Sequence, residues 1–438
     1  MNSPEELLGA TPFVSYAYSY PHKTAYRSLE SPRPLRDVWR PESRESLFLY
    51  LHVPFCEYRC GFCNLFTIAN PAADWTGRYV EQIRREAEQV RAAIPDACFT
   101  RLAFGGGTPT FLEVDQLAAL LRVATGVMGA RPKGIPVSIE ASPATVTDEK
   151  ISLLREFGAD RLSLGVQTFD EGVSRGMGRP QKTRDVDRTI AAVRTVGFPV
   201  LNLDLIYGGE GQTLEDWASS VEAAIEYQPE ELYLYPLYVR ALTGLGSQRH
   251  TWDDQRLLMY RAARELLLSH GYEQVSLRMF RRPQAPLDEG PVYCCQSDGM
   301  IGLGPGARSY CSTLHYSTEY AVGRSGVVAI LSDYLTRDAA DFGSARYGFL
   351  LDDEERQRRY VILSLLQLAG LDRSDYTARF GHDVLDDFPQ LRELISVGLA
   401  TKDECLRLTT AGLEWSDAIG PWLNSSRVRG LMERYIWH

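Results

Sequence analysis

Three cysteines within eight residues form the strongest chemical signal in the sequence. Cys56, Cys60 and Cys63 have the spacing C-x3-C-x2-C and follow directly after an apolar run at 47–53. Three thiolates on one loop can bind three irons of a [4Fe–4S] cluster and leave the fourth iron open to a substrate or cofactor. The alternatives are a zinc site, for which His52 could supply the fourth ligand, and three unligated core cysteines. We favour the cluster, because both the spacing and the position after a strand agree with it.

The other cysteines and the histidines lack the spacing of a ligand set. Cys294, Cys295 and Cys311 invite the hypothesis of a second cluster, but adjacent residues cannot both point easily at one metal and no C-x2-C accompanies them. We therefore interpret these three as buried structural cysteines. We expect His52 to pack beside the cysteine loop. Six further histidines are interpreted as surface or hydrogen-bonded residues: His22, His250, His270, His315, His382 and His438.

A run of glycines follows the next predicted strand. Gly105, Gly106 and Gly107 precede Thr108 and Pro109. Because glycine has no side chain, the backbone N–H and C=O groups of such a run can approach a ligand closely. By itself the run is typical of a tight turn, and its significance comes from the cysteine loop on the preceding strand.

Five motifs in order make the resemblance to one family specific, and the resemblance covers nearly the whole chain. The sequence resembles the radical S-adenosylmethionine (SAM) superfamily and, within it, the HemN-like branch typified by oxygen-independent coproporphyrinogen III oxidase. The N-terminal 18–21 stretch and the C-terminal helical region also fit that branch. The motifs are the cysteine loop with Tyr50–Cys56 before it, the glycine run, Ile139–Pro143, Leu164–Phe169 and Asn202–Gly208.

The resemblance implies a site and a cofactor chemistry. A SAM molecule would bind the open iron, and one electron from the cluster would cleave it to methionine and a 5′-deoxyadenosyl radical. Phe62 would pack against the adenine. Without the resemblance, Glu140 and Gln167 could equally be polar residues at strand ends that pair with neighbouring backbone. No catalytic residue is assigned. The residues implied for the first SAM are Tyr50, Gly106, Glu140, Gln167 and Arg179, and those implied for a second SAM are Gly107, Thr108 and Asp204, with Tyr238 and Arg308 near its remaining positions.

Departures from the oxidase make its reaction the second choice. Leu65 stands where the oxidase has a further cysteine, Tyr235–Arg240 differs from the corresponding strand end, and Arg308 is added to a glycine-rich loop. We therefore favour SAM-derived methyl or methylene transfer to an unactivated carbon, with two SAM molecules. The alternatives are oxidative decarboxylation of coproporphyrinogen III and a haem chaperone. The expected partners are a small-molecule substrate and an electron donor such as flavodoxin or ferredoxin.

Alternating strand and helix patterns must position these residues. Six strand-helix units are countable from residue 47, which predicts an α/β fold with a parallel sheet and right-handed crossovers, closed into a partial or full (β/α) barrel over 47–323. In such barrels the chemistry collects at the carboxyl ends of the strands. The predicted strands are Leu47–Val53, Leu102–Phe104, Ile135–Glu140, Arg161–Val166, Val200–Ile206 and Glu231–Tyr235.

Two flanking regions complete the predicted organisation. Residues 1–46 contain six prolines and are expected to form an extended, irregular arm, whose Tyr16, Tyr20 and Trp39 either cover the active site or pack in an ordinary way. Residues 324–438 are predicted to form a helical, winged-helix-like domain, with helices at 354–368, 373–380, 384–397 and 411–418 and a small hairpin. This domain has no basic recognition helix, so we do not expect it to bind DNA.

Composition excludes several classes of function. The 438 residues carry 47 Lys+Arg and 57 Asp+Glu, a net charge of −10 that argues against a nucleic-acid or anionic-membrane surface. Hydrophobic residues make up 44% and charged residues 24%, as in ordinary globular proteins. No apolar run is long enough to cross a bilayer, and no signal peptide is recognisable. We expect a cytoplasmic protein with neither nucleic acid nor membrane as a partner.

Overall fold

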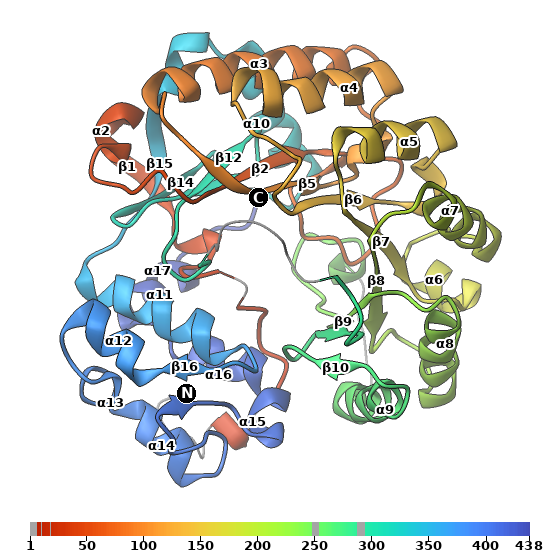
Figure 1. Cartoon of the computed structure of the whole chain (residues 1–438), viewed down its shortest axis with the longest axis vertical. Helices are drawn as coiled ribbons and strands as arrows, with labels where there is room; N and C mark the ends of the chain where they lie inside the picture. Colours follow the sequence, from red (N-terminus) through yellow and green to blue (C-terminus); the bar gives the residue numbers. More distant parts are fainter. Residues whose placement is uncertain (1–6, 10, 18, 248–253, 287–293) are drawn as a thin grey trace.

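A partial β/α barrel forms the larger part of the molecule (Figure 1). The computed structural model describes residues 7–9, 11–17, 19–247, 254–286 and 294–438. The six predicted strands are all present and parallel, which confirms the α/β fold: β2 (Leu47–Val53), β5 (Phe99–Gly106), β6 (Val137–Ala141), β7 (Arg161–Gln167), β8 (Val200–Tyr207) and β9 (Glu231–Pro236). Within the described ranges the sheet ends at two edge strands, so the barrel is partial rather than closed.

Helices cover the outer face of the sheet and connect its strands (Figure 1). Local sequence fixes where they begin and end. The Thr147 side chain accepts a hydrogen bond from the Lys150 amide at the start of α5, and Gly158 ends that helix with a φ of 110°. Thr213 and Asp216 form a capping box at the start of α8. The helices are α3 (Trp75–Ala93), α4 (Val114–Arg122), α5 (Asp148–Phe157), α6 (Glu171–Gly176), α7 (Thr183–Val196), α8 (Leu214–Glu226) and α9 (Arg256–Ser269).

The two faces of the sheet differ in chemistry. Successive strand residues point to opposite faces. In β8 Leu201, Leu203 and Leu205 belong to the apolar core, whereas Asn202 and Asp204 lie on the other, concave face. Aligned partners on parallel strands share a face, so the concave face is polar from one strand to the next. Its members include Tyr50, His52, Gly105, Ser138, Glu140, Arg161, Ser163, Asn202, Asp204 and Tyr233.

The sheet extends well beyond the predicted strands. β12 (Met300–Leu303) lies parallel to β2, and β13 (Arg308–Tyr310), β14 (Leu314–Ser317), β15 (Ser344–Leu350) and β1 (Arg27–Pro34) continue it in antiparallel fashion. At the opposite edge β11 (Met279–Arg281) and β10 (Glu273–Gln274) follow β9. The prediction of an irregular arm over residues 1–46 is therefore wrong for β1 and for α2 (Leu35–Trp39). The prolines of β1 are tolerated because it is an edge strand.

A second hydrophobic core lies in the C-terminal region, while the first core continues past residue 323. Val327 and Leu331 of α10 (Arg324–Thr336) pack in the barrel core. The second core contains Tyr20 and Tyr26 of the N-terminal segment. Its helices are α11 (Asp353–Leu365), α12 (Arg373–Phe380), α13 (Val384–Asp387), α14 (Gln390–Ser396), α15 (Thr410–Glu414), α16 (Ser416–Trp422) and α17 (Ser426–Glu433).

Two details of the C-terminal prediction need correction. The helix expected over 384–397 is divided into α13 and α14, because Pro389 precedes the second helix. The expected hairpin is reduced to a single bridge between Ala400 and Leu408, and β17 (Cys405–Leu406) pairs instead with β16 (Leu371–Asp372).

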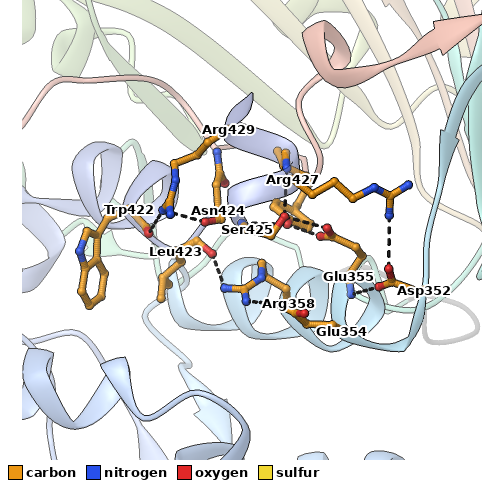
Figure 2. A network of polar contacts seen from close by, with 12 residues as sticks. Asp352, Glu354, Glu355, Arg358, Trp422, Leu423, Asn424, Ser425, Arg427 and Arg429 are labelled. Carbon is orange, nitrogen blue, oxygen red and sulfur yellow. Dashed lines mark hydrogen bonds and ion pairs between the residues drawn. The ribbon is translucent and has the colours of Figure 1, made fainter. Parts of the chain in front are cut away.

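A network of polar contacts joins α11 to α17 and to the segment before it (Figure 2). The Ser425 hydroxyl donates to Glu355 Oε1 over 2.7 Å, and Arg358 Nη1 donates to the Leu423 carbonyl over 2.7 Å. Tyr20, which is buried, also donates its hydroxyl to Glu355. The network therefore fixes one point of the N-terminal segment against the C-terminal helices. Of the helices described, none combines the length and the apolar composition needed to cross a membrane.

Candidate active site

The cysteine loop leaves the carboxyl end of β2 and rests on the glycine run that ends β5. The Gly107 amide donates to the Val53 carbonyl over 2.7 Å, and the Thr108 amide donates to the Phe55 carbonyl over 2.8 Å. The Thr108 hydroxyl also donates to Cys56 Sγ over 3.5 Å. A Cβ atom on Gly107 would lie 2.6 Å from the Phe55 oxygen and 3.0 Å from Cys56 Sγ, so close contact with the loop requires glycine there.

Arg179 is a cation that contacts the cysteine loop from another part of the chain. It lies between α6 and α7 and is buried, and its Nη1 donates to Cys60 Sγ over 3.3 Å. Its Nη2 donates to the Gly165 carbonyl over 2.5 Å, and its guanidinium carbon lies 5.4 Å from the centre of the Tyr58 ring. The structure thus brings Arg179 to Cys60 and joins it to β7 at Gly165. The loop itself is held by Gly61, whose amide donates to the Met177 carbonyl over 2.9 Å.

Two thiols of the loop, those of Cys56 and Cys60, are poor acids in this environment. Burial, with a smaller contribution from the nearby Cys63, raises the pKa of Cys56 to about 12, and the Thr108 hydrogen bond opposes the rise. Burial also raises the pKa of Cys60, which the Arg179 charge counteracts. Binding of these sulfurs to a metal as thiolates would therefore release protons.

The donor set fits a cluster with an open iron better than a zinc ion. In the described residues no group of three His, Cys, Asp or Glu side chains is arranged to hold a metal ion. The thiolates of a [4Fe–4S] cluster bind different irons, so they need not converge on one point. His52, the proposed fourth zinc ligand, has Nε2 2.9 Å from the Phe66 carbonyl and Nδ1 3.3 Å from the Tyr50 hydroxyl. Both ring nitrogens are therefore engaged elsewhere, and His52 packs beside the loop as expected.

His52 is also enclosed by glycines. Cβ atoms on Gly106 and Gly306 would lie 2.3 Å and 2.8 Å from atoms of its ring. Gly106 has a φ of 104°, in the left-handed region that favours glycine. Burial lowers the pKa of His52 to about 4, with smaller contributions from the charges of Lys23 and Arg308. The histidine is therefore neutral and acts as a packing and hydrogen-bonding residue.

Glu140 meets the glycine run from β6. Its Oε2 accepts a hydrogen bond from the Gly106 amide over 2.9 Å, and a Cβ on Gly105 would lie 2.6 Å from its carboxyl carbon. The side chain is exposed, but because it lies on the concave face it is exposed to the interior of the partial barrel. Desolvation inside the partial barrel, with a smaller contribution from the Asp204 charge, raises the pKa of Glu140 to about 7. The Gly106 hydrogen bond opposes this rise. This carboxylate is therefore presented beside the cysteine loop.

Asp204 lies on the same concave face, two strands away. Its carboxylate accepts hydrogen bonds from Ser163 Oγ over 3.1 Å and from Asn202 Nδ2 over 2.8 Å. Burial raises the pKa of Asp204, while the Arg161 charge lowers it. The electrostatic influence of Asp204 reaches Glu140, so the two acids belong to one region of the barrel interior.

The remaining residues of the predicted site take different positions. Phe62 packs in a small apolar cluster with Met177 and Leu245. Gln167 ends β7 with a φ of 70°, and its amide folds back over Gly165. Tyr238 donates its hydroxyl to Asp417 and is therefore tied to the C-terminal helices.

Several sequence interpretations are corrected here. Cys311 is buried as expected, but Cys295 is exposed and Cys294 is half-buried, because the turn before β12 carries them at the surface. His315 is 0% exposed, and among the described residues neither of its ring nitrogens has a hydrogen-bond partner, so the interpretation as a surface or hydrogen-bonded histidine is wrong there. His250 and Tyr18 lie outside the described residues.

The aromatic residues of residues 1–46 differ in role. Trp39 is buried in the barrel core, and its indole N–H donates to the Tyr316 hydroxyl over 3.0 Å, so ordinary packing explains it. Tyr16 instead lies beside the strand end of β9, with its ring centre 6.2 Å from that of Tyr235.

Sequence reasoning missed two features of the site. Glu57, inside the cysteine loop, accepts a hydrogen bond from the Ser142 hydroxyl over 2.8 Å and so links the loop to the end of β6. The position of Glu57 within the C-x3-C spacing was its only available signal. The second missed feature is the approach of Lys23 to the loop through Tyr320.

Comparisons with known proteins agree with this geometry. Residues 50–224 match the model of the Radical SAM superfamily, and residues 351–415 match the HemN C-terminal domain. The chain is 27% identical to the heme chaperone HemW of Bacillus subtilis, over 81% of this chain and 93% of that protein. It is 29% identical to the oxygen-independent coproporphyrinogen III oxidase of Pseudomonas aeruginosa, over 84% and 83% of the two chains. The solved structure of coproporphyrinogen III oxidase (HemN) from Escherichia coli has the same fold, with a TM-score of 0.78, 24% identity and coverage of 94% and 97%.

Proposed function

Because the chain belongs to the radical SAM superfamily and carries a HemN C-terminal domain, we propose that it cleaves SAM reductively at a [4Fe–4S] cluster and uses the product radical to transfer a SAM-derived carbon. Cys56, Cys60 and Cys63 would hold the cluster. The observation that carries this proposal is the packing of their loop on the glycine run, with Arg179 donating to Cys60. When bound, the cluster and SAM supply the electron and the radical chemistry, and the protein supplies position and exclusion of solvent.

Arg179 orients the loop more than it clamps a ligand. Four hydrogen bonds already engage its guanidinium, with Cys60, Gly165, Ser142 and Gln181 as acceptors. An arginine has five N–H donors, so one remains for the carboxylate of SAM. Its fixed charge beside Cys60 favours the thiolate form that a metal requires.

Glu140 is suited to the ammonium group of SAM. It accepts one hydrogen bond from the Gly106 amide and, as a carboxylate, has capacity for further donors. A bound ammonium would favour the ionised form and lower the pKa of Glu140 from its raised value. Tyr50 and Gln167 border the same interior face, and Phe62 offers an apolar surface for the adenine.

Carbon transfer is the net reaction we favour, with two SAM molecules. Gly107, Thr108 and Asp204 correspond to the positions expected for the second SAM, and all three lie at the carboxyl ends or on the concave face of the barrel strands. Leu65, at a position where the oxidase is expected to have a cysteine, is 43% exposed and supplies no thiol. The missing thiol at Leu65 supports carbon transfer over oxidation of coproporphyrinogen III.

The relatives support two other candidates. One relative is a coproporphyrinogen III oxidase and another a heme chaperone, and the chain aligns with most of each. Oxidation would release carbon dioxide from coproporphyrinogen III without methyl loss from SAM. A chaperone would bind haem without forming a carbon-transfer product. In the enzymatic cases a small-molecule substrate and an electron donor such as flavodoxin or ferredoxin are needed.

The test is anaerobic reconstitution of the full chain with iron and sulfide, followed by reduction with methyl-labelled SAM and mass spectrometry. Formation of 5′-deoxyadenosine together with S-adenosylhomocysteine is the expected result, since it shows two SAM molecules with separate fates. Formation of 5′-deoxyadenosine alone supports radical cleavage and favours either oxidation or a carbon acceptor that the assay lacks. Neither product, with an intact cluster, contradicts SAM cleavage and favours the chaperone.

A further inference from the structure

The segment that follows α17, residues 435–438, returns from the C-terminal helices to the barrel (Figure 1). The backbone oxygen of His438 accepts hydrogen bonds from the Val322 amide over 2.9 Å and from the Gly323 amide over 3.0 Å, where α10 begins. A Cβ atom on Gly323 would lie 3.2 Å from the His438 carbonyl carbon, so the two backbones are in close contact. We call residues 435–438 the returning segment.

A first line of hydrogen bonds joins the returning segment to Arg59 of the cysteine loop. The Val322 amide donates to His438, and the carbonyl of the same valine accepts from Arg59 Nη2. That guanidinium nitrogen also donates to the Cys63 carbonyl over 3.5 Å. Arg59 comes directly before Cys60, so its side chain connects the loop to the residue that holds the returning segment.

A second line runs through two tyrosines. The Tyr435 hydroxyl donates to the Tyr320 carbonyl over 2.5 Å, and the Tyr320 hydroxyl donates to the Asn64 carbonyl over 2.6 Å. Asn64 directly follows Cys63. The second line therefore reaches the loop after its last cysteine, whereas Arg59 precedes its second.

Aromatic packing supports the second line. The centre of the Tyr320 ring lies 6.1 Å from that of Tyr435 and 6.3 Å from that of Trp437. The Tyr435 and Trp437 rings meet edge to face, with their centres 5.3 Å apart, a favourable arrangement for aromatic pairs. Tyr320 is 5% exposed and Trp437 is 37% exposed, so the returning segment covers Tyr320 on its solvent side.

Cys56 is held by a different part of the molecule. The Thr108 hydroxyl donates to Cys56 Sγ, and the Thr108 amide donates to the Phe55 carbonyl, so this cysteine is tied to the end of β5. The two lines from the returning segment reach the loop farther along, at Arg59 and Asn64. Loss of these lines should therefore release Cys63 and leave Cys56 in place.

We propose that the returning segment positions residues 59–64 of the cysteine loop and so preorganises Cys63 for the cluster. Neighbouring groups that fix a ligand before the metal binds strengthen the site, because less conformational entropy is lost on binding. Arg59, Tyr320 and Tyr435 are then positioning residues, since none of them supplies a ligand. This inference rests on the proposed function in taking the three cysteines as the cluster ligands.

The first test measures alkylation of the loop cysteines by iodoacetamide in the full chain without cluster, with mass spectrometry of the peptides. We compare wild type with Tyr320→Phe and Tyr435→Phe, each of which loses one hydroxyl and keeps the ring. Each variant should raise the alkylation rate of Cys63 about fivefold, the factor for one lost hydrogen bond, and leave Cys56 within about twofold of wild type. The exposed Cys98 is the internal reference.

The matched control is Tyr272→Phe. The Tyr272 hydroxyl donates to the Pro229 carbonyl over 2.8 Å beside the edge strand β10, so the control loses the same kind of bond away from the loop. Cys63 should react in the control as it does in wild type. Equal increases at Cys56 and Cys63, or an increase in the control, would indicate general loosening of the fold and overturn the proposal. Unchanged rates in both tyrosine variants would overturn it as well.

The second test follows iron loss to a chelator from the anaerobically reconstituted full chain, without SAM. Arg59→Met, Tyr320→Phe and Tyr435→Phe should each lose iron about fivefold faster than wild type, and Tyr272→Phe at the rate of wild type. Equal rates in all five proteins would overturn the proposal. Neither test requires SAM cleavage, so both remain readable if the chain does not cleave SAM. If no cluster forms, the proposed function fails, and the alkylation rates still decide whether the returning segment positions the loop.

Discussion

Two groups of three cysteines lie in different parts of the molecule and differ in their surroundings. Those of the cysteine loop share one short segment at the carboxyl end of β2, and a buried arginine donates directly to one sulfur. The other group, Cys294, Cys295 and Cys311, flanks β12 and β13. In it, the thiols of Cys294 and Cys295 donate to the amide oxygen of Gln296, over 3.2 Å and 3.3 Å.

The difference shows what distinguishes a chemical site from ordinary packing. Both groups have an arginine that is almost fully buried, Arg179 with 7% and Arg359 with 6% of its surface exposed. Arg179 bonds to a sulfur, whereas Arg359 bonds to the backbone carbonyls of Cys295 and Gln296. In the first group the cation can stabilise a thiolate, and in the second it holds a turn in place.

The largest expected effect is the loss of cluster and of SAM cleavage when a cysteine of the loop is replaced, compared with replacement of a cysteine in the second group. We expect Cys60→Ser to lose iron and sulfide on reconstitution and to lower 5′-deoxyadenosine formation more than about 100-fold, since even indirect ligand contacts are worth about 10- to 100-fold. Iron and sulfide analysis and mass spectrometry of the SAM products measure both effects. Cys295→Ser is the matched control and should retain cluster and cleavage. Equal losses in the two variants would contradict the assignment of the cluster to the loop.

The order of the barrel elements could be read from the sequence, because each signal is local. Alternation of apolar strands with helical patterns predicts β2, β5, β6, β7, β8 and β9. The sequence also predicts helices over 148–157 and 214–226, which are the bounds of α5 and α8. Capping residues and glycine stops lie within a few positions of the helix that they end.

Long-range pairing could not be read in the same way. β1 contains Pro32 and Pro34 and has no apolar alternation, and it becomes a strand because Arg27 pairs with Gly348 in β15. The loop of Arg179 lies between two helices and has no periodic pattern, so its place in the site came from the family resemblance alone.

Replacing each of the two buried arginines in turn should separate a functional role, at Arg179, from a structural role, at Arg359. We expect Arg179→Gln to lower SAM cleavage by about 10- to 100-fold, because Cys60 loses the donor that favours its thiolate. Arg359→Gln should leave cleavage per bound cluster unchanged and lower the free energy of unfolding by about 1–3 kcal/mol, because two carbonyl groups lose their donor. Product analysis normalised to iron content and urea unfolding give the two readouts. Loss of cleavage per cluster in Arg359→Gln would contradict the distinction.

A smaller effect is expected from closing the space between the glycine run and the cysteine loop. In Gly107→Ala the new methyl group would meet the Phe55 carbonyl at 2.6 Å and Cys56 Sγ at 3.0 Å. Such overpacking costs about 1–3 kcal/mol and should reduce cluster incorporation by displacing Cys56. Gly126→Ala is the control, because a Cβ there has no atom within 4 Å. Thermal unfolding and iron content should change in the first variant alone, and equal behaviour of the two would contradict the close contact.

The smallest predicted effect is a pH dependence of the folding stability, which arises from Glu86 beside the turn between β12 and β13. Glu86 of α3 accepts hydrogen bonds from the Gly304 amide over 2.8 Å and from the Tyr334 hydroxyl over 2.7 Å. Burial raises the pKa of Glu86 from 4.5 to about 7, and these hydrogen bonds oppose the rise. The folded chain therefore keeps a proton on Glu86 at pH values where the unfolded chain has lost it. The stability that this proton contributes is complete below pH 4.5 and disappears as the pH rises to about 7.

Glu86→Gln removes this titration while retaining an oxygen that can accept both hydrogen bonds. Between about pH 5 and pH 7 the stability of wild type should fall relative to the variant, by at most about 1.4 kcal/mol per pH unit. Urea unfolding of both proteins without cluster, followed by circular dichroism across this range, measures the difference. A difference that is independent of pH, or that grows in favour of wild type as the pH rises, contradicts the raised pKa. Because Glu86 contacts the turn between β12 and β13 and no cysteine of the loop, this pH dependence should persist in Cys60→Ser, where the first group no longer binds a cluster.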